Sequence, residues 1–555
     1  MTAFGIDLGT TNSSISWLKE GKPTPILVDG HPIMPSVVMY DADRVVVGRE
    51  ARNLELQRPD ATIRSVKRRM GQEHQYLAAG RSVTPEEVSA EILRALKRGA
   101  EEVTGQAVND VVVTVPAYFD DAQRRATLKA GELAGLNVLR LLNEPTSASL
   151  VYDQVAEAEA APEIVMIYDL GGGTFDVSIL EVVEGVREVR ATAGNTHLGG
   201  DDFDEALVQL FVEELRQSGA SPKDDARAMA RLRRLAEDAK IRLSSDTEIR
   251  VREEFLCQDD RGRPVQLDRT VTRRELERRI APLLESTIAL CRRAVDDARL
   301  SGQSLGRICL VGGSTRIPMA RALLTEAFQA DIHEEIDPDL AVALGASVQA
   351  GMLTGIDVER ILVDVAAHSL GVRVVSEGDL EREQPDTFAP VLRRNTVLPA
   401  TRTEEYYTMS EDQEEVDVEV FQGEAPRCSQ NACVGSFTFA LRPAPADSPV
   451  RVEFAYDLNG VVRVSVSQPG TDNAKTVALS VADAGRAAQG SAEQSAVERK
   501  ARGLLSKLTG DDRAELEALL ESYVASEGTE RQVAEEALLD FFLDLEDLEQ
   551  DGGEP

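Results

Sequence analysis

No run of apolar residues in the sequence approaches the roughly 20 residues that a helix needs to cross a lipid bilayer. The first residues, MTAFGIDLG, also lack the basic segment and the apolar segment of a secretory signal peptide. These two absences argue against a membrane-anchored or exported protein, and they predict one that resides in the cytoplasm.

Cysteine is scarce and shows no pattern. The five cysteines are an odd number without a CxxC pair, which argues against both a disulfide framework and a zinc site. Cys428 and Cys433 share one loop, PRCSQNACVG, and two interpretations are open for them. A redox pair is one, but plain loop thiols are the preferred one in the cytoplasm.

Basic residues are outnumbered: 61 Lys and Arg stand against 96 Asp and Glu, which gives a net charge of −35. Such a surface repels a phosphate backbone, so nucleic-acid binding is disfavoured, whereas basic or extended polypeptides remain open as partners. Solubility alone accounts for most of this charge. The hydrophobic and charged fractions, 42% and 28%, are those of a folded protein, and 555 residues predict about two to four domains.

Residues 1 to about 355 alternate short β-branched runs with helical stretches, which is typical of α/β architecture. The segment TPEE at 84–87 has the N-cap, first-turn proline and acidic third position of a helix start. A buried strand, VVVTV (111–115), follows. We then expect a helix from about Asp121 and a pair of strands around LNVLRLL.

The texture of the sequence then changes. Residues 356–364 mix apolar and charged side chains and are interpreted as a linker, and residues 365–485 contain alternating runs that predict an all-β domain. Asn459-Gly460, between two of these runs, is a strong hairpin signal. Residues 486–555 return to a helical period with an excess of acids, and they predict a short helical appendage.

Two glycine motifs share one pattern: DLGGGTFD begins at Asp169, and a shorter relative, DLGTT, begins at Asp7. DLGGGTFD resembles a Walker-type loop, but no Lys-Ser or Lys-Thr follows the glycines and the next run, FDVSIL, is a strand. The motif therefore predicts a hairpin turn. Such a turn can direct backbone N–H groups at an anion, while the aspartate reaches a magnesium ion through water.

One such turn would be most simply structural, but two copies are different. An internal repeat predicts two equivalent lobes whose hairpins face each other across a cleft. The economical interpretation is a triphosphate clamped from both sides, with Asp7 and Asp169 around its metal ion.

Seven motifs, in this order, resemble the nucleotide-binding domain of the seventy-kilodalton heat-shock chaperones, the DnaK family: GIDLGTTNSS, VTVPAYFDDAQRRAT, LLNEPTSAS, YDLGGGTFDVSIL, GNTHLGGDDFD, VGGSTRIP and DPDLAVALGASVQAG. The resemblance implies an actin-like, duplicated ribonuclease-H-like α/β ATPase domain at 1–355. It further implies an interdomain linker at 356–364, a β-sandwich substrate-binding domain at 365–485 and a truncated helical lid at 486–555.

The resemblance also implies catalytic roles. Lys67, in SVKRRMG, corresponds to the lysine at the γ-phosphate, where a point charge can stabilise the transferred phosphoryl group. Glu144 corresponds to the carboxylate near the attacking water, and Thr174 and Asp176 border that site. Without the motifs, Lys67 and Glu144 would be interpreted as ordinary surface charges.

The implied ligands are ATP or ADP and Mg²⁺, with K⁺ as a further ion. The nucleotide-binding residues implied in the same way are Gly9, Thr10, Thr11, Asn12, Gly171, Gly172, Gly173, Thr174, Gly199, Gly200, Glu237, Lys240, Ser244, Gly312, Gly313, Ser314, Arg316 and Asp339.

The adenosine side is supported by spacing as well. Glu237, Lys240 and Ser244 stand at i, i+3 and i+7, so they share one face of a helix. A solvated charged face is the default interpretation of such a triplet. In the family this face binds ribose and adenine, and the arginine of GGSTR, Arg316, packs its guanidinium plane on the base.

Residues for communication between domains are implied too. Pro116 and Arg124 match the family's proline switch and the arginine that answers it, and Arg140, Asn143 and Asp364 match positions for J-domain co-chaperones and for the linker. ATP would then shift the population towards a docked linker and loosen the peptide site. A nucleotide exchange factor is a further expected partner.

The sequence departs from the family pattern around the linker. ILVD (361–364) is one residue shorter than the usual leucine-rich form, so the strength of coupling is expected to differ. Ala366-Ala367-His368 replaces the usual Thr-Pro-Leu. His368 is interpreted as a satisfied loop residue rather than a titrating switch.

The peptide-binding positions implied by the resemblance are Val375, Tyr406, Met409, Val416 and Val418. A bulky Met409 opposite Val375 suggests an arch that closes over a peptide with its contributors inverted. The surrounding segment, Glu404–Glu419, carries eight acids and no Lys or Arg, which predicts a preference for hydrophobic peptides with basic flanks. The compact nucleotide domain, the Thr-Met arch and the short lid together most resemble the HscC-type branch, and the short lid predicts fast peptide release.

The leading hypothesis is an ATP-dependent chaperone with a weak, co-chaperone-stimulated ATPase that binds extended hydrophobic segments of unfolded proteins. A holding or exchange factor with little ATP cycling is an alternative, which the presence of Lys67, Glu144, Pro116 and Asp364 disfavours. A small-molecule kinase or a filament-forming protein of the actin superfamily would have no use for the linker and the strand domain.

Overall fold

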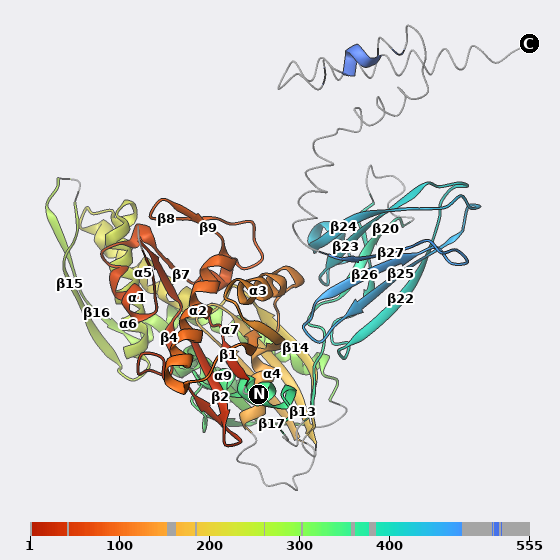
Figure 1. Ribbon diagram of the computed structural model, residues 1–555. Helices are drawn as coiled ribbons and strands as arrows, with labels where there is room; N and C mark the ends of the chain where they lie inside the picture. The colour runs from red at the N-terminus through yellow and green to blue at the C-terminus, as the bar shows by residue number, and fades with distance from the viewer. Residues whose placement is uncertain are drawn as a thin grey trace, which may run out of the picture. The chain divides into compact units, whose positions relative to one another are not determined.

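The computed structural model describes most of the chain (Figure 1). The described residues are 3–41, 44–152, 163–183, 186–259, 261–300, 304–356, 361–376, 385–479, 513, 516–520 and 523. Apart from the last seven of these, the predicted lid at 486–555 lies outside the described residues. Residues 1–434 and 438–479 form one compact unit.

The first lobe, residues 3–143, is built on a sheet in the order β11-β10-β1-β2-β3. β1 runs parallel to β10 and antiparallel to β2. Helices α2 (Pro85–Thr104) and α3 (Asp121–Leu133) belong to this lobe, and α2 begins with the predicted capping box of Thr84 and Glu87. The strands are β1 (Phe4–Asp7), β2 (Asn12–Lys19), β3 (Lys22–Pro25), β10 (Asp110–Val115) and β11 (Asn137–Asn143). The predicted pair of strands around LNVLRLL is therefore wrong: this run forms the single strand β11, whose partner is β10.

The second lobe, residues 163–340, repeats this arrangement. Its sheet has the order β18-β17-β12-β13-β14, with β12 antiparallel to β13 and parallel to β17. Strand directions and order therefore match those of the first lobe, so the internal repeat that the two glycine motifs predicted is present in the topology. The strands are β12 (Glu163–Leu170), β13 (Phe175–Val183), β14 (Val186–Asn195), β17 (Leu305–Val311) and β18 (Asp331–His333).

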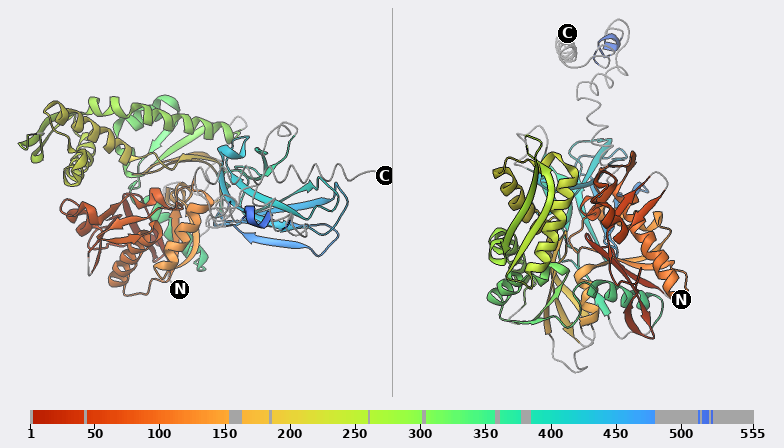
Figure 2. Two further views of the ribbon diagram at one scale, coloured as in Figure 1. Left: turned by 90° about the horizontal axis from the view of Figure 1, so that it is seen from above. Right: turned by 90° about the vertical axis from the view of Figure 1, so that its left-hand side faces the viewer.

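Helices α4 (Glu144–Tyr152) and α9 (Ala341–Leu353) lie between the two sheets. Both are rich in small residues, and α9 packs on β1 and β2 while α4 packs on β12 and β13. One apolar core joins side chains of both sheets and both helices, including Val112, Ile167 and Ala346. The right view of Figure 2 shows the two lobes side by side.

The outer face of the second lobe carries most of its helices. A large apolar core packs them against the sheet, and the hairpin of β15 (Glu248–Gln258) and β16 (Pro264–Thr272) contributes to it. The helices are α5 (Gly200–Gln217), α6 (Ala226–Leu243), α7 (Arg273–Asp297) and α8 (Pro318–Ala327). None of the helices in the described part of the chain is both long and apolar enough to cross a membrane.

Residues 365–479, here called the β-domain, form two four-stranded sheets with the orders β21-β20-β23-β24 and β22-β25-β26-β27. Burial alternates along β25 and β26, as the alternating sequence predicts. These two strands form the predicted hairpin, and Gly460 in its loop has a φ of 69°. The strands are β20 (Leu370–Val374), β21 (Thr387–Leu392), β22 (Ala400–Tyr407), β23 (Glu415–Gln422), β24 (Ala432–Ala440), β25 (Pro449–Tyr456), β26 (Val462–Ser467) and β27 (Ala474–Ala478).

The core of the predicted linker is itself a strand, β19 (Ile361–Val363). It pairs in parallel with Val186–Glu188 of β14 and so adds a sixth strand to the sheet of the second lobe. The linker thereby ties the β-domain to the edge of the sheet of the second lobe.

Candidate nucleotide site

The two glycine hairpins face each other at the base of a cleft between the lobes. A Cβ atom placed on Gly172 would lie 1.8 Å from Thr11 Oγ1, and one on Gly173 would lie 2.4 Å from Thr10 Cγ2. No side chain fits at either glycine while the hairpins stay this close. The Thr11 hydroxyl is buried and has no hydrogen-bond partner among the described residues, so it is available to a ligand.

A cavity of about 380 Å³ opens above the hairpins. Its lining draws on both lobes and contains 18 of the residues singled out from the sequence. These are Asp7, Gly9, Thr10, Thr11, Asn12, Lys67, Glu144, Asp169, Gly171, Gly172, Thr174, Glu237, Lys240, Gly312, Gly313, Ser314, Arg316 and Asp339. The other walls include residues that the sequence did not single out: Ile33, Pro35, Arg49, Arg52, Ile241, Pro338 and Val342.

Five of the residues predicted to bind nucleotide or to act in catalysis are absent from this lining and lie close behind it or beyond it. Gly199 and Gly200 form the start of α5, where the Gly200 amide donates to the Gly171 carbonyl at 3.0 Å. Gly173 lies in the second hairpin, and Asp176 is buried on β13. Ser244 caps the end of α6 and donates to the Lys240 carbonyl at 3.3 Å.

Buried carboxylates gather beneath the cavity. Burial, with the nearby Glu144 carboxylate, raises the pKa of Asp7 to about 7 and that of Asp176 to about 7. The same causes raise the pKa of Asp169 well above its ordinary value. Such a group of acids favours a cation, because a divalent ion would neutralise charges that burial makes costly.

The donor set fits magnesium held through water. Within the described residues, no three His, Cys, Asp or Glu side chains converge closely enough to ligate one metal ion directly. Magnesium usually keeps several waters and takes one or two carboxylates plus phosphate oxygens. Asp7 and Asp169, at the ends of equivalent strands, suit that role.

Lys67 lies in a one-turn helix, η2 (Val66–Arg69), and is 3% exposed. Its ammonium group contacts the Glu144 carboxylate and lies 5.8 Å from the centre of the Phe119 ring. The predicted phosphate lysine and the predicted carboxylate for the attacking water are therefore ion-paired in the structure.

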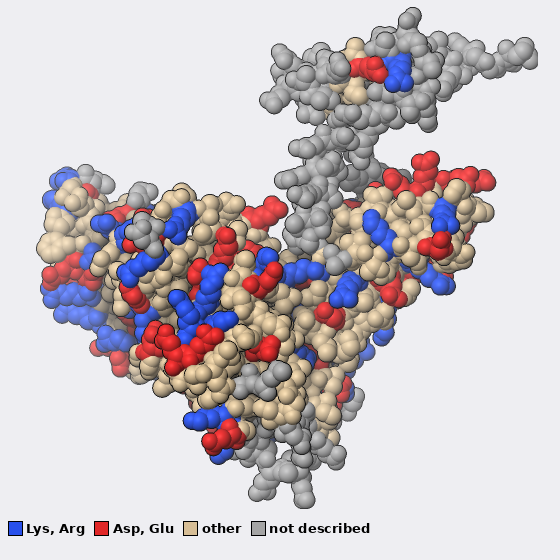
Figure 3. Space-filling model, in the orientation of Figure 1, with Lys and Arg blue, Asp and Glu red and all other residues tan. Residues whose placement is uncertain are grey.

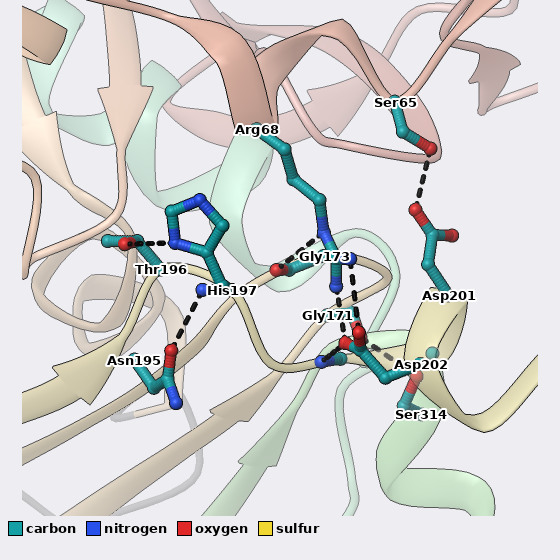
Figure 4. A network of polar contacts seen from close by, with 12 residues as sticks. Ser65, Arg68, Gly171, Gly173, Asn195, Thr196, His197, Asp201, Asp202 and Ser314 are labelled. Atoms are coloured by element: carbon teal, nitrogen blue, oxygen red, sulfur yellow. Dashed lines mark hydrogen bonds and ion pairs between the residues drawn. The ribbon is translucent and has the colours of Figure 1, made fainter. Parts of the chain in front are cut away.

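Figure 4 shows how the second lobe holds the segment that carries Lys67. The Ser65 hydroxyl donates to Asp201 at 2.6 Å, and Arg68 pairs with Asp202 while its Nε donates to the Gly173 carbonyl at 3.1 Å. Both acids stand in the first turn of α5. The position of Lys67 thus depends on contacts that cross the cleft.

A second set of contacts crosses the cleft near the adenosine side. The guanidinium of Arg52 lies 2.8 Å from one oxygen of Glu237, and that of Arg64 lies 3.7 Å from the other. Arg64 also lies 3.7 Å from Glu55 in its own lobe. Sequence reasoning missed both arginines, since a lone arginine outside a motif carries no signal of a partner 185 or 173 residues away.

Three of the five residues predicted to transmit signals are linked by hydrogen bonds that lead towards the β-domain. Arg124 donates to the Asn143 side chain at 2.8 Å and to the Asn459 carbonyl at 3.2 Å, and Asn143 donates to Asp364 at 2.9 Å. Arg140 is buried near Asp364, and burial lowers its pKa. Pro116 begins the loop between β10 and α3, and its carbonyl accepts a hydrogen bond from the Phe119 amide at 3.1 Å.

Comparison with known proteins decides the family. A family model described as "Hsp70 protein" matches residues 3–79 and 74–542. The chain belongs to the Hsp70 family. It is 41% identical over 485 residues to "Chaperone protein DnaK" of Thermotoga petrophila and, equally, of Thermotoga maritima, which is 86% of this chain and 80% of each relative. The same-named protein of Thermosipho africanus is 40% identical over 486 residues, 86% of this chain and 79% of that relative.

Membership of the Hsp70 family confirms the resemblance that the seven motifs indicated, and the finer assignment to the HscC-type branch stays a prediction. The five positions predicted to bind peptide lie in the part of this Hsp70 chain called the β-domain. Val375 and Met409 are 47% and 71% exposed, whereas Val418 on β23 is buried. Tyr406 stands on β22 and Val416 on β23, in different sheets. Cys257, Cys291 and Cys309 of the Hsp70 chain are buried free thiols, while in the shared loop Cys428 is buried and Cys433 is exposed.

Proposed function

We propose that the chain is an ATP-dependent chaperone in which ATP binding and hydrolysis control the affinity of the β-domain for extended hydrophobic peptides. One observation carries the proposal: a cavity closed by two facing glycine hairpins, with Lys67, Glu144 and the aspartates at its base, in a unit whose linker strand β19 leads directly to the β-domain. We interpret residues 1–355 accordingly as an actin-like ATPase domain, 356–364 as the linker, and 486–555 as a short lid.

The residues supply a simple mechanism. The hairpin amides and the Thr10 and Thr11 hydroxyls would hold the phosphates from both sides. Magnesium, held through water by Asp7 and Asp169, would neutralise phosphate charge. Lys67 would exchange its pairing with Glu144 for the γ-phosphate, which leaves the Glu144 carboxylate free to orient the attacking water.

The adenosine end would lie between α6 and the loop after β17. Glu237 and Lys240 line the cavity there, while Arg316 is half exposed and is held by Asp337 at 2.7 Å and by Asp339 at 3.1 Å. These two acids orient the guanidinium plane, which supports its proposed stacking on the base. Ser244 is set back from the cavity and would need to move to reach the ribose.

Peptide would bind in the β-domain near the five predicted positions. The neighbouring segment Glu404–Glu419 carries eight acids and no Lys or Arg, and Figure 3 shows acidic side chains gathered along one edge of the β-domain. Charge reversal at Glu411, Asp412, Glu414 and Glu415 should weaken binding of a peptide with basic flanks but not of the same core with alanine flanks. Equal affinities before and after reversal for the basic peptide would contradict this preference.

The steady-state ATPase rate, measured alone, with a J-domain and with a panel of hydrophobic peptides, tests the function. Stimulation by both additions is expected. Turnover that depends on a sugar or acetate acceptor would favour a small-molecule kinase, and peptide binding without turnover would favour a holding factor. Cytoplasmic residence and dependence on an exchange factor belong to the same proposal.

A further inference from the structure

His368 lies just after the linker, between β19 and β20, where the sequence departs from the family pattern. Its Nε2 lies 3.0 Å from the main-chain carbonyl oxygen of Tyr118 in the first lobe. The two rings meet edge to face, with centres 4.2 Å apart and planes at 61°. The histidine of the β-domain is therefore fixed to Tyr118 by a hydrogen bond and by ring packing.

Tyr118 stands two residues after Pro116, in the loop between β10 and α3. Its amide N–H donates to Oδ1 of Asp176 at 3.0 Å. The main chain of Tyr118 is thus held on one side by a proposed catalytic carboxylate and on the other by His368. Tyr118 is therefore the single residue that connects His368 with Asp176, and a displacement of His368 can move the amide that Asp176 accepts.

The protonation of His368 suits this contact. A carbonyl oxygen can only accept a hydrogen bond, so Nε2 carries the hydrogen, and the neutral imidazole with this tautomer is sufficient. Burial lowers the pKa of His368, which keeps the ring neutral, and the charged groups that act on this pKa are Asp120, Glu424 and Arg124.

We propose that His368 is a positioning residue that couples the β-domain to Asp176 through the main chain of Tyr118. This inference rests on the proposed function, since coupling has meaning only if peptide and ATP binding influence each other. It adds to that function a coupling role for His368, which the sequence alone indicated to be a satisfied loop residue.

A peptide bound in the β-domain can alter hydrolysis only through contacts whose free energy differs with and without peptide. The bond between His368 and Tyr118 exists only while the β-domain lies against the first lobe. Loss of that bond frees the Tyr118 amide to move away from Asp176, so the carboxylate changes its environment as the domains separate.

The test compares three variants of the full chain. His368→Leu removes the donor and keeps an apolar group of similar size, and His368→Gln keeps an N–H donor at a similar distance from the backbone. His74→Leu is the matched control, because His74 also packs edge to face on a tyrosine, Tyr76, at 4.4 Å, but within one lobe. His368→Met replaces the leucine variant if that variant does not fold.

The first readout is the stimulation of kcat by saturating peptide, with KM for ATP measured in parallel. In His368→Leu we expect the stimulation to fall about two- to tenfold, the effect of one hydrogen bond of ordinary strength, with KM unchanged. His368→Gln and His74→Leu should retain it. Unchanged stimulation in His368→Leu, or an equal loss in His368→Gln, would overturn the proposal.

The second readout does not require chaperone function. Hydrogen exchange of the backbone at 117–120 should be faster in His368→Leu than in the wild type, and normal in His368→Gln. If no peptide stimulates the wild type, the proposed function fails, and this measurement still decides whether His368 positions Tyr118. Equal exchange in all variants would overturn that role.

Discussion

At the scale of single residues, the two copies of the hairpin differ in the residue that pairs with the aspartate. Asp7 pairs across its sheet with Ser14, whereas Asp169 pairs with Asp176 at the equivalent position. Asp176 is 1% exposed and its pKa is raised to about 7 by burial and by Glu144. Only the second copy therefore contributes an extra acid beneath the cavity, and this acid would make the proposed reaction site asymmetrical although the two hairpins are equivalent in topology.

Asp176→Asn should change how the stability of the nucleotide-free protein depends on pH. The folded state keeps the Asp176 proton up to pH of about 7 and the unfolded chain loses it near 3.8, so rising pH destabilises the fold across this window. The full loss is on the order of 4 kcal/mol. Asparagine keeps the oxygen that accepts the Tyr118 amide, so the variant should melt at a higher temperature than the wild type at pH 8 and lose this advantage towards pH 5.

Melting curves at pH 5, 6, 7 and 8 measure this effect. If the melting temperatures of the wild type and of Asp176→Asn change in parallel with pH, Asp176 is already ionised in the nucleotide-free fold.

Lys67→Met should reduce kcat about 100- to 1000-fold, as expected when one charge that stabilises a transition state is removed from a buried site. KM for ATP should change little, since the hairpins supply most of the phosphate contacts. Lys97→Met is the control: Lys97 lies on the exposed side of α2 and donates to the Gly135 carbonyl at 2.9 Å. A KM increase with normal kcat in Lys67→Met would assign the lysine to binding instead.

Sequence reasoning reached the residues that sit in repeated or long motifs and missed those that act singly. The hairpins were predictable because glycine, threonine and aspartate recur with one phasing. Arg64 and Arg68 were not, because their partners Glu237 and Asp202 are distant in the sequence. His368 was given a passive role, since only the fold shows that Tyr118 lies beside it.

At the scale of elements, the linker is a strand because of its partner. Three apolar residues are too few to specify a strand, and the pairing with β14 forms across about 175 residues of chain. The strands of the β-domain, by contrast, were predictable from their own alternation, and α2 from its cap. Local sequence patterns thus predicted the elements whose own residues carry a clear signal. They did not predict β19, which depends on a partner strand far away in the sequence.

Leu362→Asp should release β19 from the sheet. Leu362 packs against the core between the lobes, whereas its neighbour Ile361 is 60% exposed. A carboxylate at 362 would lose this apolar contact and should reduce the docked fraction about tenfold. Hydrogen exchange at Val186–Glu188 reports the docking, and Ile361→Asp provides a control that should leave it unchanged.

Protection at Val186–Glu188 that survives Leu362→Asp would show that the backbone pairing alone holds β19, and that the apolar contact of Leu362 is incidental to docking.

At the scale of the whole molecule, ion pairs and a hydrogen bond outside the hairpins join the two lobes across the cleft. Arg52 and Arg64 reach from the first lobe to Glu237 on α6, and Ser65 and Arg68 reach to the start of α5. The nucleotide would be enclosed beneath these contacts. They must break before it leaves, so they are expected to slow its release.

Arg64→Ala should speed release of ADP two- to fivefold, about what a partly exposed ion pair contributes. The measurement is the dissociation rate of a fluorescent ADP analogue after dilution into unlabelled nucleotide. Arg58→Ala is the matched control, because Arg58 pairs with Asp41 and Asp60 inside the first lobe. Equal rates in the wild type and in Arg64→Ala would show that Arg52 alone governs this side of the cleft.

The pairing of β19 with β14 also has a consequence for self-association. A strand at the rim of a sheet exposes unused amide and carbonyl groups, and other chains can pair with them. Docked, the linker covers Val186–Glu188 at that rim. Each time it departs, the rim and the apolar side chains of Leu362 and Val363 are uncovered together, so the chain shields this template for polymerisation only while the linker remains bound.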